Sequence, residues 1–413
     1  MPDEDSISAG YISPQLPLPP PPPGQPGGWG TEPRPQPDRR SRRRRVVAGA
    51  LVVFVLLASG LGAGLLPRTN DASAPLPGRS STGRVDVGAH ASAIAAKVEP
   101  GIVDVNTVLG AGGSVGQPVG RGAGTGMILT SSGEVLTNNH VIQGATKIDI
   151  SIPGRGGTYT ATVLGADYAA DVALLQIQGI SGLSTVTLGD SSSVSTGQEV
   201  VAIGNALGKG GTPSVTEGTI SEIGRSIAVS DDHGGTEHLT DMIQTSVPIQ
   251  PGDSGGALVD PSGEVIGMIT AGGQRVGIGV APSSVGFAIP TSKALDIVND
   301  IRAGNGSATL IIGQAGFLGV LVRPVDSATA TRLGLNGTSG ALVVGAIEGT
   351  PAMKAGIKQG SVITAIDDTQ ITSPETLGPA LWAHRPGGQI RVTWVDQDGT
   401  HKVTVSLIAG PAV

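Results

Sequence analysis

The chain has 413 residues, a net charge of −7, 66 glycines, no cysteine and only 2% aromatic residues. Its length predicts two domains with appended segments, and the missing cysteine excludes disulfides, thiolate metal sites and a cysteine nucleophile. Nucleic-acid binding is disfavoured because the net charge is acidic and basic residues are not spread through the body of the chain.

The N-terminal segment has the composition of a tail followed by a membrane anchor. Residues 1–45 are rich in proline and end in a cluster of arginines, which predicts a disordered cytoplasmic tail. Residues 46–66 contain no charged side chain and are long enough to form a transmembrane helix. Because arginines stay on the cytoplasmic side, we expect a single-pass protein of the cell membrane with everything after residue 66 outside the cytoplasm. A cleaved signal peptide, ending near Ala72-Ser73-Ala74, is the alternative.

A polar linker at residues 67–89 leads into a first domain that we place at residues 90–304. Its short apolar runs, separated by glycine turns, are typical of a mainly β fold. Strands are expected at residues 126–129, 147–150, 160–164, 199–203 and 264–270. The domain ends with a helix from Pro290 to Gly304, for which Thr291 and Ser292 are the expected N-terminal cap.

Neither glycine-rich string of this domain fits a nucleotide site. The string from Gly122 to Gly126 is followed by a strand, whereas a dinucleotide loop needs a helix. In the string from Gly204 to Gly211, a glycine follows the lysine where a phosphate loop needs Ser or Thr. His233 and His238 lie near acidic residues, but a solvated loop explains them better than a metal site, because no second pair of ligands is near. No metal and no organic cofactor is expected.

One serine stands out for its chemistry. In Gly252-Asp253-Ser254-Gly255-Gly256, the glycines allow a sharp turn that exposes the Ser254 hydroxyl and lets main-chain N–H groups converge. A serine nucleophile needs a base, and the base needs a carboxylate to orient it. His140 lies at the end of the strand-like run Val135-Leu136-Thr137-Asn138-Asn139-His140-Val141-Ile142, and Asp171 opens a run that reads as a buried strand. We therefore predict that His140, Asp171 and Ser254 act together.

These motifs, in this order along the chain, resemble the HtrA-type trypsin-like serine proteases. The resemblance covers residues 90–410 and includes Ala202-Ile203-Gly204-Asn205 and Gly286-Phe287-Ala288-Ile289-Pro290. It implies a chymotrypsin-like double β-barrel with the three catalytic residues at the junction of the barrels. It also implies peptide hydrolysis through an acyl-enzyme, with the N–H groups of Gly252 and Ser254 as the oxyanion hole.

The resemblance also suggests how substrate binds and where this chain departs from its relatives. Ile269, Thr270 and Ala271 are expected to form the strand that pairs with the substrate backbone, and their small apolar surroundings predict cleavage after small aliphatic residues. Most HtrA relatives carry Asn at the position of Asp253, and many carry Asp at the position of Ser246. The role of Asp253, and whether the resting site is fully formed, are therefore open.

Residues 314–410 resemble a PDZ domain through Gly316-Phe317-Leu318-Gly319-Val320 and Ala355-Gly356-Ile357-Lys358-Gln359-Gly360. The resemblance implies that the amides of Phe317, Leu318, Gly319 and Val320 bind the terminal carboxylate of a peptide, which adds as a strand. A helix at residues 374–384 would line the groove with Leu377 and Leu381. The alternative is that Val320 and Leu381 simply fill a small core.

The predicted protein is a serine endopeptidase that cleaves unfolded or misfolded extracytoplasmic proteins, as in protein quality control and stress response. Its PDZ domain would bind peptide C-termini for regulation or substrate capture. The alternative is a peptide sensor or holding chaperone that acts mainly through that domain. Relatives often form a homotrimer through aromatic residues near the start of the protease domain. No aromatic residue occurs between positions 90 and 158, so the oligomeric state is left open.

Overall fold

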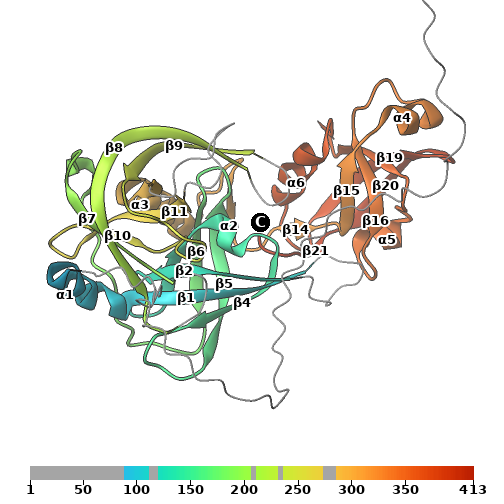
Figure 1. Cartoon of the computed structure of the whole chain (residues 1–413). Helices are drawn as coiled ribbons and strands as arrows, with labels where there is room; N and C mark the ends of the chain where they lie inside the picture. Colours follow the sequence, from blue (N-terminus) through green and yellow to red (C-terminus); the bar gives the residue numbers. More distant parts are fainter. Residues whose placement is uncertain (1–87, 111–119, 206–210, 231–235, 273–284) are drawn as a thin grey trace, which may run out of the picture. The chain divides into compact units, whose positions relative to one another are not determined.

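The computed structural model describes residues 88–110, 120–205, 211–230, 236–272 and 285–413, and it confirms the mainly β expectation (Figure 1). The predicted tail and transmembrane helix, at residues 1–45 and 46–66, lie outside these ranges. Across the ranges that are described, no helix combines the length and the apolar character needed to cross a bilayer. The membrane anchor therefore stays a prediction from sequence.

The first barrel is a closed antiparallel sheet of six strands with a seventh strand on its edge. The strands are β1 Ile102–Leu109, β2 Gly120–Ile128, β3 Glu134–Thr137, β4 Ala145–Ser151, β5 Thr158–Asp167, β6 Val172–Ile177 and β13 Leu310–Ile312. They follow the order β13-β5-β4-β1-β2-β3-β6, and a further pairing of β5 with β6 closes the ring. Inward-facing side chains such as Val103, Ile128 and Leu175 fill its core.

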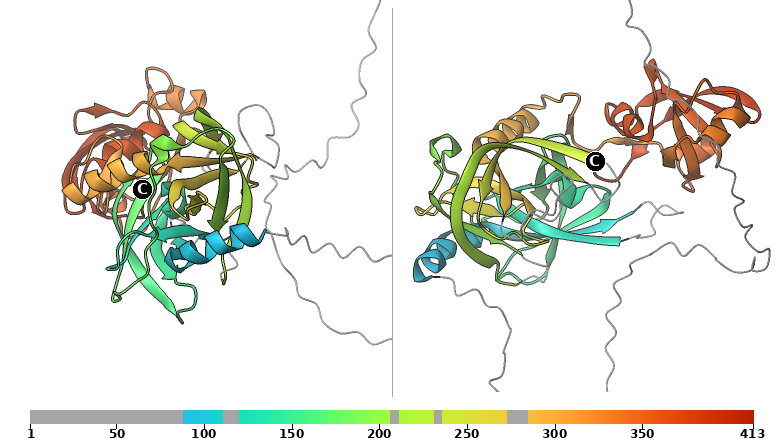
Figure 2. Two further views of the ribbon diagram at one scale, coloured as in Figure 1. Left: turned by 90° about the vertical axis from the view of Figure 1, so that its left-hand side faces the viewer. Right: turned by 45° about the horizontal axis from the view of Figure 1, so that its top comes forward.

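The second barrel is closed as well, in the order β10-β11-β12-β9-β8-β7. Its strands are β7 Glu199–Gly204, β8 Ser214–Ser230, β9 Thr236–Thr245, β10 Ala257–Val259, β11 Val265–Gly272 and β12 Gly286–Pro290. Helix α1 (Ala89–Val98) contacts β7 and β8 at the rim of this barrel (Figure 2). The five strands expected from the sequence lie in β2, β4, β5, β7 and β11, and none of them extends more than one residue beyond the observed strand.

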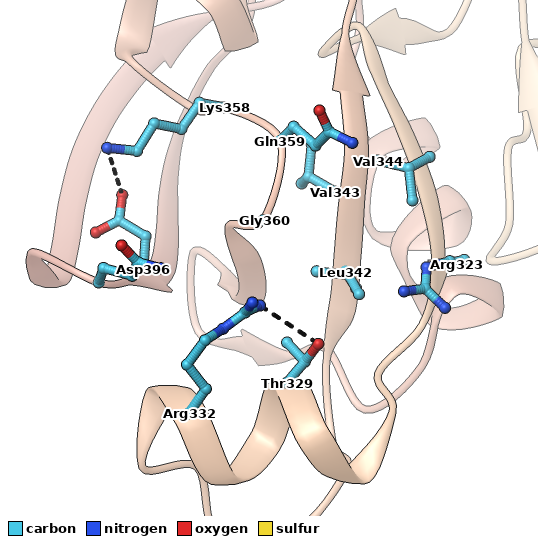
Figure 3. Close-up of a pocket in the computed structure, with 11 residues that line it drawn as sticks. Arg323, Thr329, Arg332, Leu342, Val343, Val344, Lys358, Gln359, Gly360 and Asp396 are labelled. Atoms are coloured by element: carbon cyan, nitrogen blue, oxygen red, sulfur yellow. Dashed lines mark hydrogen bonds and ion pairs between the residues drawn. The ribbon is translucent and has the colours of Figure 1, made fainter.

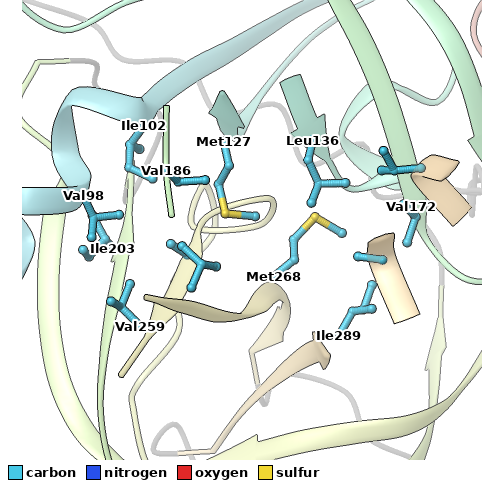
Figure 4. Close-up of a cluster of buried hydrophobic side chains, with 14 of the residues drawn as sticks. Val98, Ile102, Met127, Leu136, Val172, Val186, Ile203, Val259, Met268 and Ile289 are labelled. Atoms are coloured by element: carbon cyan, nitrogen blue, oxygen red, sulfur yellow. The ribbon is translucent and has the colours of Figure 1, made fainter. Parts of the chain in front are cut away.

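An apolar layer joins the two barrels. Met127 and Val172 from the first barrel lie in one buried cluster with Ile203 and Met268 from the second (Figure 4). Fully burying such a side chain contributes roughly 1.5–3 kcal/mol. A layer built from many of them holds the barrels against each other, so that groups from both can meet in one site.

The helix after the second barrel begins differently from the expectation. Helix α3 spans Thr291–Ala303, and Gly304 ends it in the left-handed conformation, as predicted. Its N-cap residue is Pro290, however, which makes no side-chain cap bond, and neither Thr291 nor Ser292 is the cap. The Ser292 N–H donates instead to the Ser191 hydroxyl at 3.0 Å. The predicted Thr291 cap is wrong because the Thr291 hydroxyl donates instead to the carbonyl of Val265, at 2.8 Å.

The strand-like run that carries His140 is divided between two elements. β3 ends at Thr137, and Asn139–Ile142 form the single helical turn α2. Val141 and Ile142 are buried there as the inner face of the turn. A short apolar run does not distinguish a strand from a buried helical turn, which is why the sequence suggested a strand up to His140.

The C-terminal domain is a smaller antiparallel sheet with three helices. Its helices are α4 Ser327–Leu333, α5 Pro351–Ala355 and α6 Pro374–Trp382. Its strands are β14 Gly316–Phe317, β15 Val320–Pro324, β16 Ala341–Ala346, β17 Val362–Ile366, β18 Thr369–Gln370, β19 Gln389–Asp396, β20 Gly399–Ser406 and β21 Ile408–Ala409. β15 is an edge of the sheet β15-β16-β17-β19-β20, and β14 pairs with β21. The helix expected at residues 374–384 is present as α6 and ends two residues earlier.

Candidate active site

Strand pairing in the first barrel brings His140 and Asp171 together. β3 and β6 are antiparallel neighbours with Thr137 opposite Ala173, so the residues after β3 meet those before β6. Asp171 is 1% exposed and has φ +56, a left-handed conformation that is uncommon for aspartate. The side-chain amide of Asn138 donates to its carbonyl oxygen at 2.9 Å and so supports this conformation.

The Asp171 carboxylate accepts hydrogen bonds from three groups. The His140 main-chain N–H lies 2.9 Å from Oδ1, and His140 Nδ1 lies 3.0 Å from Oδ1 and 2.9 Å from Oδ2. The Thr270 hydroxyl donates to Oδ2. A carboxylate at Nδ1 favours the tautomer with a proton there, which places the imidazole lone pair on Nε2. This is the tautomer that a general base needs.

Ser254 belongs to the loop before β10 and is connected to the same cluster. Its hydroxyl donates to the carbonyl of Thr270 at 3.1 Å, and the hydroxyl of Thr270 binds Asp171. Gly255, with φ +84, leaves no room for a side chain, since a Cβ there would lie 2.0 Å from the Thr125 carbonyl oxygen. The structure thus gathers His140, Asp171 and Ser254 into one cluster in which Thr270 contacts both the carboxylate and the serine.

The residues just before Ser254 form a tight turn. The Asp253 N–H donates to the Gln250 carbonyl at 3.0 Å, and Gly252 has φ +99. Pro251 followed by glycine is the preferred sequence for the centre of a type II turn, in which the third residue takes a positive φ. Within the described part of the chain, neither the Gly252 nor the Ser254 N–H donates a hydrogen bond. Both are available to an oxyanion.

Asp253 is buried, and its contacts show what it does. Its Oδ2 accepts the Gln250 N–H at 2.9 Å and its Oδ1 accepts the Ser214 hydroxyl at 3.2 Å. Burial raises the pKa of this carboxyl, an effect that the two hydrogen bonds only partly offset. The sequence left the role of Asp253 open; in the structure it closes the turn through neutral donors.

The predicted substrate strand lies in β11. Ile269 is 1% exposed and belongs to the core of the second barrel. Its N–H donates to Gly256 and its carbonyl accepts from Gly255, so it supports the nucleophile loop. Both of its main-chain groups are therefore used inside the domain, and substrate binding by Thr270 and Ala271 stays a prediction from sequence.

The C-terminal domain presents a second loop with available N–H groups. Gly319 has φ +86, its carbonyl accepts the Ile347 N–H at 2.9 Å, and the Leu318 carbonyl accepts the Ala352 N–H at 2.9 Å. Among the described residues, the N–H groups of Leu318 and Gly319 have no acceptor. Phe317 and Val320 flank them as parts of β14 and β15.

The two leucines that were expected to line the peptide groove lie in the core. Leu377 and Leu381 are 3% and 7% exposed and pack in one cluster with Leu318 and Ile366. Val320 is partly buried against the same cluster. The placement of Val320 and Leu381 agrees with the alternative, in which they fill the core. Little of Leu377 or Leu381 is left exposed to a ligand.

A cavity of about 420 Å³ lies elsewhere in this domain, between α4, β16 and the loop at residues 358–360 (Figure 3). Two of the cations that rim it have acidic neighbours, since Arg323 pairs with Asp326 and Lys358 with Asp398. We assign it no ligand. Over the described ranges, no three His, Asp or Glu side chains gather as a metal site.

Motif reading missed the residues that hold these loops. Thr125 contacts the turn from Gln250 to Asp253, which we call the oxyanion turn. Asn138 contacts Asp171, and Thr350 contacts the loop at Gly319. One usable sign was present, because the Gly122 to Gly126 string places a threonine between glycines on a strand. A Cβ on Gly124 would lie 3.1 Å from the Ser254 carbonyl and closer still to Val141. The glycines there let the nucleophile loop and α2 pack onto β2.

Comparisons with known proteins agree with this architecture. Residues 124–268 match the trypsin-like peptidase domain and residues 316–407 match the PDZ domain. The serine protease PepD of Mycobacterium tuberculosis is 32% identical over 334 residues, which are 77% of this chain and 66% of PepD. A probable periplasmic serine endoprotease, DegP-like, of Chlamydia trachomatis is 36% identical over 70% of this chain and 54% of its own length. This chain therefore spans about half to two thirds of these two relatives.

Two further relatives are matched over more of their length. The serine protease Do-like HtrA of Lactococcus lactis is 31% identical over 69% of this chain and 70% of that protein. The solved structure of the HtrA-type protease AlgW with tripeptide is 32% identical and covers 78% of this chain and 96% of its own, with a TM-score of 0.44. On the identity and coverage of the Lactococcus lactis protease and on the two matched domains, the chain belongs to the HtrA-type, trypsin-like serine proteases with a C-terminal PDZ domain.

Proposed function

We propose that the chain is a serine endopeptidase that cleaves unfolded or misfolded proteins. The observation that carries the proposal is the hydrogen-bonded cluster of His140, Asp171, Thr270 and Ser254. Beside it, the N–H groups of Gly252 and Ser254 donate to no other residue that the structure describes. Asp171 is almost fully buried, whereas His140 is exposed and Ser254 half-buried. A substrate can therefore reach the base and the nucleophile while the carboxylate stays shielded from water.

The proposed reaction is acyl transfer to Ser254. The hydroxyl turns from the Thr270 carbonyl toward the imidazole, His140 takes its proton, and the Ser254 oxygen attacks the peptide carbonyl. The imidazolium is stabilised by Asp171 and protonates the leaving amine, and water then releases the acyl group by the same route. The N–H groups of Gly252 and Ser254 bind the oxyanion; losing one such donor typically lowers kcat by roughly a hundredfold or more. No step needs a metal or an organic cofactor.

The site of action that we propose is outside the cytoplasm, at the membrane. The support comes from the uncharged stretch at residues 46–66 after the arginine cluster. Several relatives are named as probable periplasmic endoproteases. A protease held there by one helix would meet unfolded polypeptides that have crossed the membrane.

The proposed partner of the PDZ domain is the C-terminus of a polypeptide. The available N–H groups of Leu318 and Gly319 suit a carboxylate, and β15 is an edge strand that an extended peptide can extend. Such binding would serve substrate capture or regulation of the protease.

Casein digestion by the full chain and by its Ser254→Ala variant tests the proposed activity. We expect the wild type to cleave casein and the variant to be slower by about a millionfold, which is below detection. Circular dichroism should show the same fold for both. Hydrolysis by a Ser254→Ala preparation that is free of other proteases would refute the assignment.

A further inference from the structure

Thr125, in β2, directs its N–H and its hydroxyl toward the loop that carries Ser254. It is fully buried, at 0% exposed. Its N–H donates to the Ser254 carbonyl at 2.8 Å, and its hydroxyl donates to the Gly252 carbonyl at 2.7 Å. The same hydroxyl oxygen accepts the Asn205 N–H at 2.8 Å. Because that N–H occupies the acceptor side of the oxygen, the hydroxyl proton is directed toward Gly252.

These bonds connect Gly252 and Ser254, the two residues whose N–H groups would form the oxyanion hole, to the same residue, Thr125. The Gly252–Asp253 peptide is bound at both ends, its carbonyl by Thr125 and its N–H by Gln250. The Ser254–Gly255 peptide is also bound at both ends, its carbonyl by Thr125 and its N–H by Ile269. A peptide unit is planar, so fixing these two units fixes the positions of the residues between them. Gly252 and Ser254 are thereby placed relative to each other and to the first barrel, which carries His140.

The turn sequence and Thr125 have different tasks. Pro251 and Gly252 favour the type II turn, which decides the direction of the Gly252 N–H. That preference does not decide where the turn sits. Gly252 is half-buried, and without the hydroxyl its carbonyl would have no donor among the described residues. A carbonyl that loses its donor in such a place is costly enough to move a loop. The turn would then shift toward another donor and carry the Gly252 N–H with it.

We infer that Thr125 is a positioning residue of the oxyanion hole, acting through its side-chain hydroxyl on Gly252 and its N–H on Ser254. The inference rests on the proposed serine endopeptidase function. It makes Thr125 neither a base nor a donor to substrate. Its contribution is to hold two N–H groups where the charge develops, and a displacement of about 1 Å in such groups can lower the rate by roughly a hundredfold.

Three substitutions at Thr125 and one elsewhere test the inference in the full chain. Thr125→Val removes the hydroxyl at nearly constant volume, Thr125→Ser keeps it, and Thr125→Cys offers a weaker donor. Thr291→Val is the matched control, because Thr291 is also buried, at 2% exposed, and makes one hydroxyl bond to a carbonyl, at 2.8 Å. Steady-state kinetics on one peptide substrate, with the folded fraction measured by circular dichroism, compares them.

We expect Thr125→Val to lower kcat by about tenfold to a hundredfold with KM changed by less than about threefold. Thr125→Ser and Thr291→Val should keep kcat within about threefold of the wild type. The kcat of Thr125→Cys should lie between those of Thr125→Val and Thr125→Ser. Binding of a peptide boronate, whose tetrahedral adduct places an oxygen in the oxyanion hole, should weaken in parallel with kcat. A merely structural role would lower the melting temperature and leave kcat per folded molecule and boronate affinity unchanged, which would overturn the inference.

A measurement that needs no catalysis separates this inference from the proposed function. Hydrogen–deuterium exchange in the segment 249–256 should be faster in Thr125→Val than in the wild type and unchanged in Thr125→Ser and Thr291→Val. Equal exchange in all of them would overturn the positioning role even in an active enzyme. A wild type that cleaves nothing, or an active Ser254→Ala variant, would instead refute the endopeptidase while the exchange result still judged Thr125.

Discussion

Two loops of this molecule present main-chain N–H groups that suit an anion, and different contacts hold each loop in place. The turn at Gly252 and the loop at Gly319 both contain a glycine at positive φ, +99 and +86, and both direct carbonyls inward while leaving N–H groups without acceptors among the described residues. Each lies against a fully buried threonine, Thr125 and Thr350. The first is suited to a transient oxyanion and the second to a peptide carboxylate.

The difference lies in what holds each glycine carbonyl. The Gly252 carbonyl is held by one side-chain hydroxyl, that of Thr125. The Gly319 carbonyl is held by the Ile347 main-chain N–H at 2.9 Å. The Thr350 hydroxyl reaches it only at 3.4 Å and lies closer to the Ile347 carbonyl, at 2.5 Å. Among the described residues, the Gly252 carbonyl therefore depends on one side chain, whereas the Gly319 carbonyl is held by a main-chain bond that most substitutions preserve.

The largest effect in the carboxylate loop should come from Gly319→Ala. A Cβ there would lie 2.2 Å from the Thr350 side chain, and φ +86 is strained for alanine. We expect affinity for a fluorescent decapeptide with a free C-terminal valine to fall by about tenfold or more, measured by fluorescence polarisation, because the loop must move.

Gly334→Ala is the control for strain alone, because Gly334 has φ +65 and open space where a Cβ would lie. It should bind the decapeptide like the wild type, and the decapeptide amide should bind neither protein. Unchanged affinity in Gly319→Ala would show that this loop does not hold the carboxylate.

A pH effect is expected on the side of the molecule that carries the oxyanion turn. Asp104 pairs with Thr125 across β1 and β2, is 5% exposed, and burial raises its pKa to about 6. The folded protein therefore binds the proton of the Asp104 carboxyl group more tightly than the unfolded chain does. The stability that this binding contributes is full below about pH 4 and is lost as the pH rises through 6. Asp104→Asn removes that loss and should gain stability relative to the wild type, by up to about 3 kcal/mol, between pH 4 and pH 7.

Urea denaturation at pH 4.5 and pH 7.5 measures this change, with Ser254→Ala in both chains to prevent self-cleavage. Asp398→Asn, at an exposed aspartate, serves as the control. A difference between Asp104→Asn and its parent that is the same at both pH values would contradict the assigned ionisation of Asp104.

The smallest effect should come from Thr350→Val, and it tests the comparison itself. Because the Ile347 N–H still binds the Gly319 carbonyl, decapeptide affinity should change by less than about threefold. The corresponding change at Thr125 is expected to lower kcat by about tenfold to a hundredfold. If fluorescence polarisation shows that Thr350→Val loses binding as strongly as Gly319→Ala does, the two loops depend on their threonines alike and the contrast between them is wrong.

Short sequence motifs made much of the fold predictable, and with it the cluster of His140, Asp171 and Ser254. The motifs around His140, Asp171 and Ser254 are short and contiguous, and short apolar runs separated by glycine turns indicated the strands. The roles of Thr125 and Thr350 were not predictable in the same way. The hydroxyl bond of Thr125 joins residues 127 positions apart, and no local pattern reports such a partner. The mistaken cap at Thr291 has the same origin, since a distant carbonyl took the hydroxyl.

The most direct test of the account is to identify the residue that a fluorophosphonate modifies. The reagent phosphonylates a serine only where a base activates the hydroxyl and N–H donors bind the developing oxyanion. Peptide mapping by mass spectrometry of the labelled full chain should place a single adduct on Ser254, and Asp171→Asn should slow its formation by several orders of magnitude. An unmodified chain, or an adduct on another residue with Ser254 intact, would contradict the central claim.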